Sequence, residues 1–198
     1  MTVQVQSIFR TIPTFSPPAN DARITGEELF AMGDIGRTEL VRGEIIYMSP
    51  TGYLHGFIEV RIAKLLSLFV DERKPGRVLG GEVGIYIARN PDTVRGADVA
   101  FISNERLAQA KSQSFLDVAP ELIVEVMSPD DRWVDIHDKL AEYLAIGVQM
   151  VWVANPLRQQ VHVYHSLTDI KILSAGDELT GEDALPGFSA PVSALFEG

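Results

Sequence analysis

Two apolar runs decide the fold: Gly96-Ala97-Asp98-Val99-Ala100-Phe101-Ile102 and Leu122-Ile123-Val124-Glu125-Val126-Met127. Each carries one acid inside a segment whose pattern predicts a buried β-strand. A predicted helix, Asp135 to Ile146, follows and carries Lys139. An ionised carboxylate inside a strand is costly unless it is paired or holds a metal. Two such acids and a nearby lysine are the minimum set for metal-assisted phosphodiester hydrolysis.

Asp98 and Glu125 are the candidate metal ligands. Because side chains alternate along a strand, the two carboxylates converge near the strand ends if their strands are neighbours. Hard oxygen ligands of this kind suit Mg²⁺ or Mn²⁺, which lower the pKa of a bound water. Each acid taken alone has another interpretation, a strand acid that caps a loop or pairs with an arginine. The two together favour the metal site.

Lys139 is the candidate catalytic lysine. The apolar stripe of its helix is formed by Ile136, Leu140, Tyr143 and Leu144, and Lys139 falls at the edge of that stripe. An ammonium group there could hold the attacking water or stabilise the charge of the transition state. The alternative is a surface lysine whose stem covers apolar side chains while its charge stays in water.

Glu44, Glu82 and His55 are further candidates. Glu44 and Glu82 lie in strand-like runs, and Glu44 could be a ligand or a base that orients water. His55 begins a long predicted helix, where it either bonds the preceding loop or acts as a proton shuttle or phosphate contact. The remaining histidines are too scattered for a zinc site and are expected to be structural or exposed: His137, His162 and His165.

Composition places the chain among globular proteins. Its 198 residues suit one domain, with 46% hydrophobic and 22% charged residues. No apolar run approaches a membrane-spanning length, and the N-terminus lacks a signal-peptide pattern. The absence of cysteine excludes disulfides and thiol catalysis and is compatible with a cytoplasmic location.

The net charge of −10 argues against tight binding to DNA, since nucleic-acid binders usually carry a basic surface. The charge is uneven along the chain. After Lys139 there are seven acids and two bases, so a local groove for phosphates remains possible elsewhere.

The chain divides into an N-terminal arm, residues 1–22, and one domain, residues 23–198. The arm is polar and rich in proline, which predicts an extended segment. In the domain, Thr25-Gly26-Glu27-Glu28 is a capping box for a short helix. The other predicted elements are a strand pair or one kinked strand (39–48), helices at 55–70, 105–110 and 135–146, strands at 78–88 and around Asp98 and Glu125, a central strand (150–154) and an edge strand (160–165).

An ordered series of short segments between residues 25 and 165 resembles the Uma2 family (also called DUF820) of endonuclease-like proteins. That family lies within the PD-(D/E)XK restriction-endonuclease-like superfamily. The similar segments are Glu39 to Ile46, Met48-Ser49-Pro50 with His55-Gly56, Gly96 to Phe101, Pro120 to Pro129, Lys139 to Tyr143, Gly147-Val148, Trp152-Val153 and Asn155-Pro156.

The resemblance implies that Asp98 and Glu125 bind the metal and that Lys139 is the catalytic lysine, moved from the strand to the following helix. It also implies Glu44 and His55 as pocket residues. In the usual superfamily pattern the lysine stands two residues after the acid, where this chain has Met127.

Two further departures from the family pattern are Ala97, where proline is usual, and Asn155, where aspartate is usual. Neither removes a proposed ligand. The expected fold is therefore an α/β restriction-endonuclease-like single domain with a central mixed β-sheet and helices on both faces.

The expected function is Mg²⁺-dependent hydrolysis of phosphodiester bonds in DNA by Asp98, Glu125 and Lys139, supported by Glu44 and His55. Two alternatives on the same fold are a catalytically inactive nucleic-acid-binding module and a structural, oligomeric protein with a vestigial pocket. Apolar segments in the tail make a homodimer a further expectation.

Overall fold

Ten strands and five helices lie in the part of the chain that the computed structural model describes, residues 23–129 and 131–197. The predicted arm, residues 1–22, lies outside the described residues. The strands are β1 (Thr38–Val41), β2 (Glu44–Tyr47), β3 (Gly76–Ala88), β4 (Thr93–Ser103), β5 (Leu122–Val126), β6 (Met150–Asn155), β7 (Gln160–Tyr164), β8 (Ile170–Leu173), β9 (Glu178–Thr180) and β10 (Ser189–Pro191). The helices are α1 (Gly26–Ala31), α2 (Tyr53–Arg73), α3 (Asn104–Leu107), α4 (Trp133–Ala145) and α5 (Ser193–Phe196).

The main sheet is mixed, as predicted. Its strand order is β2-β1-β4-β5-β6-β7-β8, with β3 paired to β4, and only the β5–β6 pair among these is parallel. Helix α4 supplies the connection between the parallel strands β5 and β6, as a parallel crossover requires. Strands β9 and β10 form a separate two-stranded sheet.

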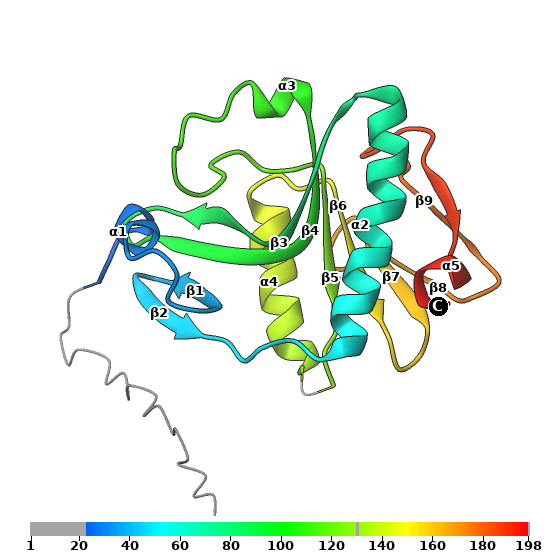
Figure 1. Ribbon diagram of the computed structural model, residues 1–198, viewed down its shortest axis with the longest axis horizontal. Coiled ribbons are helices and arrows are strands. Elements are labelled where there is room, and N and C mark those ends of the chain that lie inside the picture. The colour runs from blue at the N-terminus through cyan, green and yellow to red at the C-terminus, as the bar shows by residue number, and fades with distance from the viewer. Residues whose placement is uncertain (1–22, 130, 198) are drawn as a thin grey trace, which may run out of the picture.

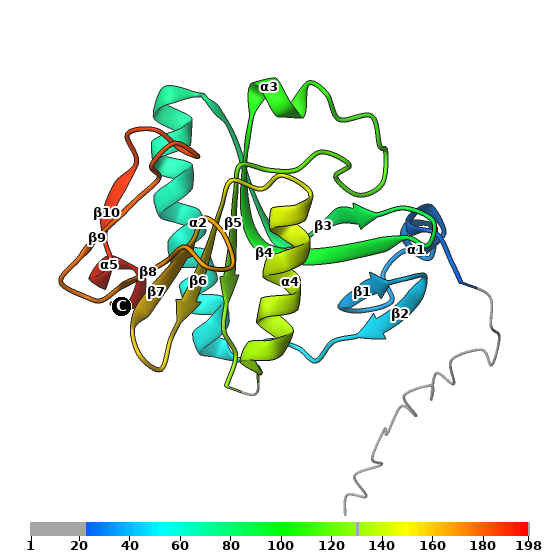
Figure 2. The ribbon, with the colours of Figure 1, turned by 180° about the vertical axis from the view of Figure 1, so that it is seen from behind.

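Helices cover both faces of the main sheet (Figures 1 and 2). On one face, Ile58, Ile62 and Leu66 of α2 pack on β4, β5 and β6 together with the C-terminal segment. On the other face, α4 packs through buried Ile136, Leu140 and Tyr143, three members of its predicted apolar stripe. Because β4 to β6 are covered on both faces, their side chains are nearly all buried, and the acids within them stand out.

Several local predictions are confirmed. The capping box at Thr25 is present, with its side chain accepting from the backbone N–H of Glu28. Of the two alternatives predicted for residues 39–48, the structure has the strand pair, β1 and β2, joined by a turn in which Arg42 and Gly43 have φ values of 52° and 82°. Helix α4 stops before Gly147, whose φ of 98° is outside the range of a right-handed helix.

Three element predictions need correction. Helix α4 begins at Trp133, two residues before Asp135, and the Trp133 ring stacks on His162 at 4.9 Å. Helix α3 ends at Leu107 and is shorter than predicted. Strand β7 is not an edge strand, because β8 pairs with it along Val161 to Tyr164. No described helix is long and apolar enough to cross a membrane.

Candidate active site

The two predicted acids lie next to the end of the ladder between β4 and β5. The ladder between these strands pairs Phe101 with Leu122, Ala100 with Ile123 and Val99 with Val124. One further step would place Asp98 opposite Glu125. At this position a side chain, not the backbone of β4, bonds β5: Asp98 Oδ2 accepts from the backbone N–H of Val126 at 2.6 Å. Asp98 and Glu125 thus occupy the next positions of the β4–β5 register, close enough for the charge of Glu125 to raise the pKa of Asp98.

Lys139 turns its ammonium group inward from α4. Its Nζ lies 2.9 Å from Glu39 Oε1 and 3.2 Å from Glu125 Oε2, and it donates to the carbonyl oxygen of Gly96 at 3.2 Å. Three acceptors match the three donors of an ammonium group. The side chain is only 17% exposed, so Lys139 is not the snorkelling surface lysine of the alternative interpretation.

Glu39 is an acid of this cluster that the sequence interpretation missed. Its buried carboxylate binds Lys139, accepts from Arg95 Nη1 at 2.8 Å and accepts from the backbone N–H of Gly96 at 3.2 Å. The structure does not bring the predicted Glu44 into the cluster. Glu44 starts the edge strand β2 and is exposed, while Glu39 lies on the inner strand β1 that pairs with β4.

Two residues that were not predicted as site residues fix the acids and the helix. The Tyr143 hydroxyl donates to Glu125 Oε1 at 2.8 Å. Arg95 holds Glu142 of α4 with two hydrogen bonds, of 2.6 Å from Nε and 3.1 Å from Nη2. The only sequence signal for Tyr143 is its place on the apolar stripe, and Arg95 carries none, because its partners lie far away in the chain.

His55 reaches Asp98 from the first turn of α2. Its Nε2 lies 3.1 Å from Asp98 Oδ2, and its Nδ1 is buried without a hydrogen-bond partner among the described residues. Glu59, one turn along the helix, completes a group with His55 and Asp98 whose potential ligand atoms all lie within 4.8 Å of one another. Within the described ranges, this is the one such group of three found.

The other candidates lie outside the cluster. Glu82 stands at an irregularity of β3 and forms an ion pair with Arg37. His162 stacks on Trp133, and His165 Nε2 lies 2.7 Å from Glu182. These two histidines have structural or surface contacts, as predicted.

Burial and charge shift the ionisation of the cluster. Burial raises the pKa of Asp98 well above its usual range, and the charge of Glu125 raises it further. Burial also raises the pKa of Glu125, although Lys139 and Tyr143 oppose the shift. For Lys139, burial alone would lower the pKa, but the carboxylates of Glu125 and Glu39 outweigh it and raise the pKa above its usual range.

The basic partners act differently on the remaining groups. Burial raises the pKa of Glu39, but Lys139 and Arg95 outweigh burial, and its pKa is lowered overall. Burial and the positive charge of Arg37 lower the pKa of His55, which favours the neutral imidazole. Carboxylate oxygens, here those of Asp98 and Glu59, are the ligands that a hard divalent cation prefers. The donor set around Asp98 therefore fits such an ion, whose charge would favour ionised Asp98.

Comparison with known proteins places these features in a family. The family model for Uma2, described as "Putative restriction endonuclease", matches residues 27–193. A solved structure described as a "putative nuclease belonging to DUF820" from Anabaena variabilis superposes with a TM-score of 0.73 at 18% sequence identity. The match covers 87% of this chain and 97% of that one. No curated protein matches the sequence.

Proposed function

This chain belongs to the Uma2 family, and from that premise we propose that it is a metal-dependent nuclease that hydrolyses phosphodiester bonds in DNA. One observation carries the proposal. Asp98 and Glu125 lie at adjoining positions of the neighbouring strands β4 and β5, and Lys139 Nζ lies 3.2 Å from Glu125 Oε2. Two carboxylates and a buried ammonium group provide the elements that metal-assisted hydrolysis needs.

Asp98 and Glu125 would hold Mg²⁺ or Mn²⁺, with His55 and Glu59 beside Asp98. A divalent ion bound there supplies an activated water and polarises the phosphoryl oxygen. His55 is a positioning residue in this proposal. Because its Nε2 lies 3.1 Å from Asp98 Oδ2, the imidazole fixes the carboxylate orientation while remaining neutral.

Lys139 acts as a cation rather than as a base. Its raised pKa keeps the ammonium group protonated at neutral pH, so it can donate hydrogen bonds but cannot accept a proton. It would orient the attacking water and stabilise the negative charge that develops on the phosphate oxygens. Glu39 and the Gly96 carbonyl hold the ammonium group in place before substrate arrives.

Cleavage assays with supercoiled plasmid and short single-stranded DNA, each with Mg²⁺, Mn²⁺ or chelator, test the proposal. We expect metal-dependent cleavage that falls at least about a hundredfold in Asp98→Asn and Lys139→Met. Lys64→Met removes an exposed lysine of α2 and is the matched control. Glu44→Gln is expected to keep full activity, because Glu44 is exposed outside the cluster.

Folded protein that cleaves nothing under any of these conditions contradicts the nuclease proposal. It would favour the alternative of a catalytically inactive nucleic-acid-binding module on the same fold. Cleavage that survives in Asp98→Asn would instead place the chemistry elsewhere in the molecule.

A further inference from the structure

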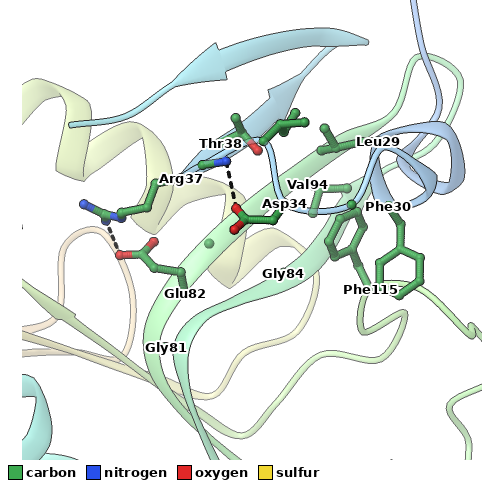
Figure 3. A pocket seen from close by; sticks show the side chains of 14 residues that line it. Leu29, Phe30, Asp34, Arg37, Thr38, Gly81, Glu82, Gly84, Val94 and Phe115 are labelled. Atoms are coloured by element: carbon green, nitrogen blue, oxygen red, sulfur yellow. Dashed lines mark hydrogen bonds and ion pairs between the residues drawn. The ribbon is translucent and has the colours of Figure 1, made fainter. Parts of the chain in front are cut away.

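A pocket of about 620 Å³ lies beside the catalytic cluster, between α1, the segment that leads into β1 and the β3–β4 pair (Figure 3). Phe30 and Phe115 form an aromatic wall at one end, and Arg37 and Glu82 lie at the other (Figure 3). The two phenylalanine rings meet edge to face, with centroids 5.6 Å apart and an interplanar angle of 87°.

The floor of the pocket is bare backbone. Gly84 of β3 and Gly96 of β4 stand directly opposite each other in the ladder. A Cβ atom at Gly84 would lie 2.2 Å from Cδ1 of Phe115, and one at Gly96 would lie 2.8 Å from Oε2 of Glu82. Glycine at both positions therefore leaves room for the Phe115 ring and for the Glu82 carboxylate.

Gly96 joins this pocket to the catalytic cluster. Its backbone N–H donates to Glu39 at 3.2 Å, and its carbonyl oxygen accepts from Lys139 at 3.2 Å. Thr38, the neighbour of Glu39, also lines the pocket. A group held in the pocket would thus lie against Gly96, the residue whose backbone contacts Glu39 and Lys139.

The pocket suits a flat ring with hydrogen-bond donors on its edge. Phe30 is 53% exposed and offers a stacking surface. Asp34 and Glu82 offer acceptor oxygens: Asp34 Oδ1 also accepts from the backbone N–H of Gly36, and Glu82 Oε1 is paired with Arg37. Arg37 donates in addition to the carbonyl oxygen of Ser49. Nucleobases carry N–H donors on the edge used for pairing, and an unpaired base can present that edge.

The charge of the chain favours the same kind of ligand. A net charge of −10 opposes close tracking of the phosphates of a duplex. Stacking of a base on an aromatic ring needs no positive charge and is open to any base with an accessible face.

We propose that this pocket holds an unpaired nucleobase of the substrate, next to the phosphate that is cleaved. The inference rests on the proposed nuclease function and names its substrate class as nucleic acid with a single-stranded or extrahelical nucleotide. The ligand is an unpaired base, which either DNA or RNA can supply.

Binding can be measured without cleavage in the Asp98→Asn variant, by fluorescence anisotropy with labelled oligonucleotides. The probes are a single strand, a duplex with one bulged nucleotide and a fully paired duplex, each made as DNA and as RNA. We expect the first two to bind at least about tenfold more tightly than the paired duplex. The series that binds more tightly, DNA or RNA, identifies which nucleic acid supplies the base.

Phe30→Ala, added to Asp98→Asn, should weaken binding of the single strand and the bulged duplex by roughly tenfold. Phe30→Tyr should retain the binding, because the ring is kept. Leu68→Ala is the control, since Leu68 is also an exposed apolar residue, 61% exposed, on a helix away from the pocket. Thermal unfolding of each variant checks that the fold is kept.

Asp34→Ala is a second variant, which keeps the test valid if Phe30→Ala does not fold. Removing an acid from an acidic protein should strengthen a purely electrostatic interaction with phosphates. We expect weaker binding of the unpaired probes instead, because an acceptor for the base is lost.

The two proposals fail in different ways. Equal binding of paired and unpaired probes, or binding unaffected by Phe30→Ala and Asp34→Ala, overturns the pocket proposal even if the wild-type protein cleaves DNA with Mn²⁺. Binding of unpaired probes that depends on Phe30, with no cleavage by the wild-type protein in any metal, supports the pocket and overturns the nuclease proposal.

Discussion

At Asp98, burial and the charge of Glu125 both oppose ionisation. A carboxyl group whose pKa is raised by folding binds its proton more tightly in the folded state than in the unfolded state. The free energy of unfolding therefore falls as the pH rises from the ordinary pKa of about 3.8 through the raised value. In the metal-free protein, Asp98 therefore costs stability at neutral pH.

Asp98→Asn is accordingly expected to stabilise the metal-free protein at pH 7 by about 1 kcal/mol, while removing activity. The asparagine oxygen can still accept from the backbone N–H of Val126. Urea denaturation in chelator at several pH values measures the effect, which should vanish near pH 3. Asp138→Asn, at an exposed position of α4, is the control. A variant that is less stable than the wild type at pH 7 would contradict the argument.

Lys139→Met is expected to destabilise the protein by roughly 3 kcal/mol, because it leaves the largely buried carboxylates of Glu39 and Glu125 without their cation. The double variant Lys139→Met with Glu39→Gln should recover part of this loss, since it removes one of the two carboxylate charges left unpaired. Equilibrium unfolding of the four proteins of this cycle gives the coupling energy. Additive losses would show that the Lys139–Glu39 contact contributes nothing.

The sequence made Asp98, Glu125 and Lys139 candidates because acids in apolar runs and a lysine at the edge of an apolar stripe are unusual. It named Glu44 and missed Glu39. Both acids lie in strand-like residues of one hairpin, and their roles depend on which strand pairs with β4. That pairing joins Leu40 to Val94, a contact between distant parts of the chain that no local pattern encodes.

At the scale of elements, Arg95 clamps α4 and the β1 hairpin onto β4. Its guanidinium binds Glu142 through two nitrogens and Glu39 through the third. A lysine has a single nitrogen and cannot reproduce this geometry. Arg95→Lys should therefore lower the free energy of unfolding by about 2 kcal/mol and reduce cleavage through a shifted Glu39.

Chemical denaturation and cleavage rates measure both effects of Arg95→Lys. Arg158→Lys, at an exposed position after β6, should change stability by less than about 0.5 kcal/mol. If Arg95→Lys behaves like this control, the clamp is not needed to position the site.

Element types were predictable where the sequence pattern was strong, as in the apolar stripe of α4 and the continuous apolar run of β6. The position of each strand within the sheet was less predictable from the sequence. The alternation of residues 160–165 suggested an edge strand, yet β8 pairs alongside, with Ile170, Lys171 and Ile172 exposed. A strand with one exposed face and a strand at an edge give similar sequence patterns, so alternation alone cannot separate them.

At the scale of the whole molecule, the charge of −10 predicts a weak dependence of nucleic-acid binding on salt. Each phosphate that is neutralised on a single strand contributes about −0.7 to the slope of log K against log salt concentration. If a base in the Phe30 pocket provides most of the affinity, we expect a slope of about −1. Anisotropy titrations between 50 and 300 mM salt would measure it, and a slope steeper than roughly −4 would indicate phosphate tracking instead.

The contacts of Lys139 have a consequence for how the protein would be stored and switched on. Its ammonium group already balances Glu125 and Glu39, so the chain carries its own counter-ion beside the place where a divalent ion would bind. Under the proposed function, folding would then not depend on the metal, and the ion would be added to a site whose charges are already partly balanced. A newly made molecule would be folded but inactive, and the local concentration of divalent ions would determine when it cleaves its substrate.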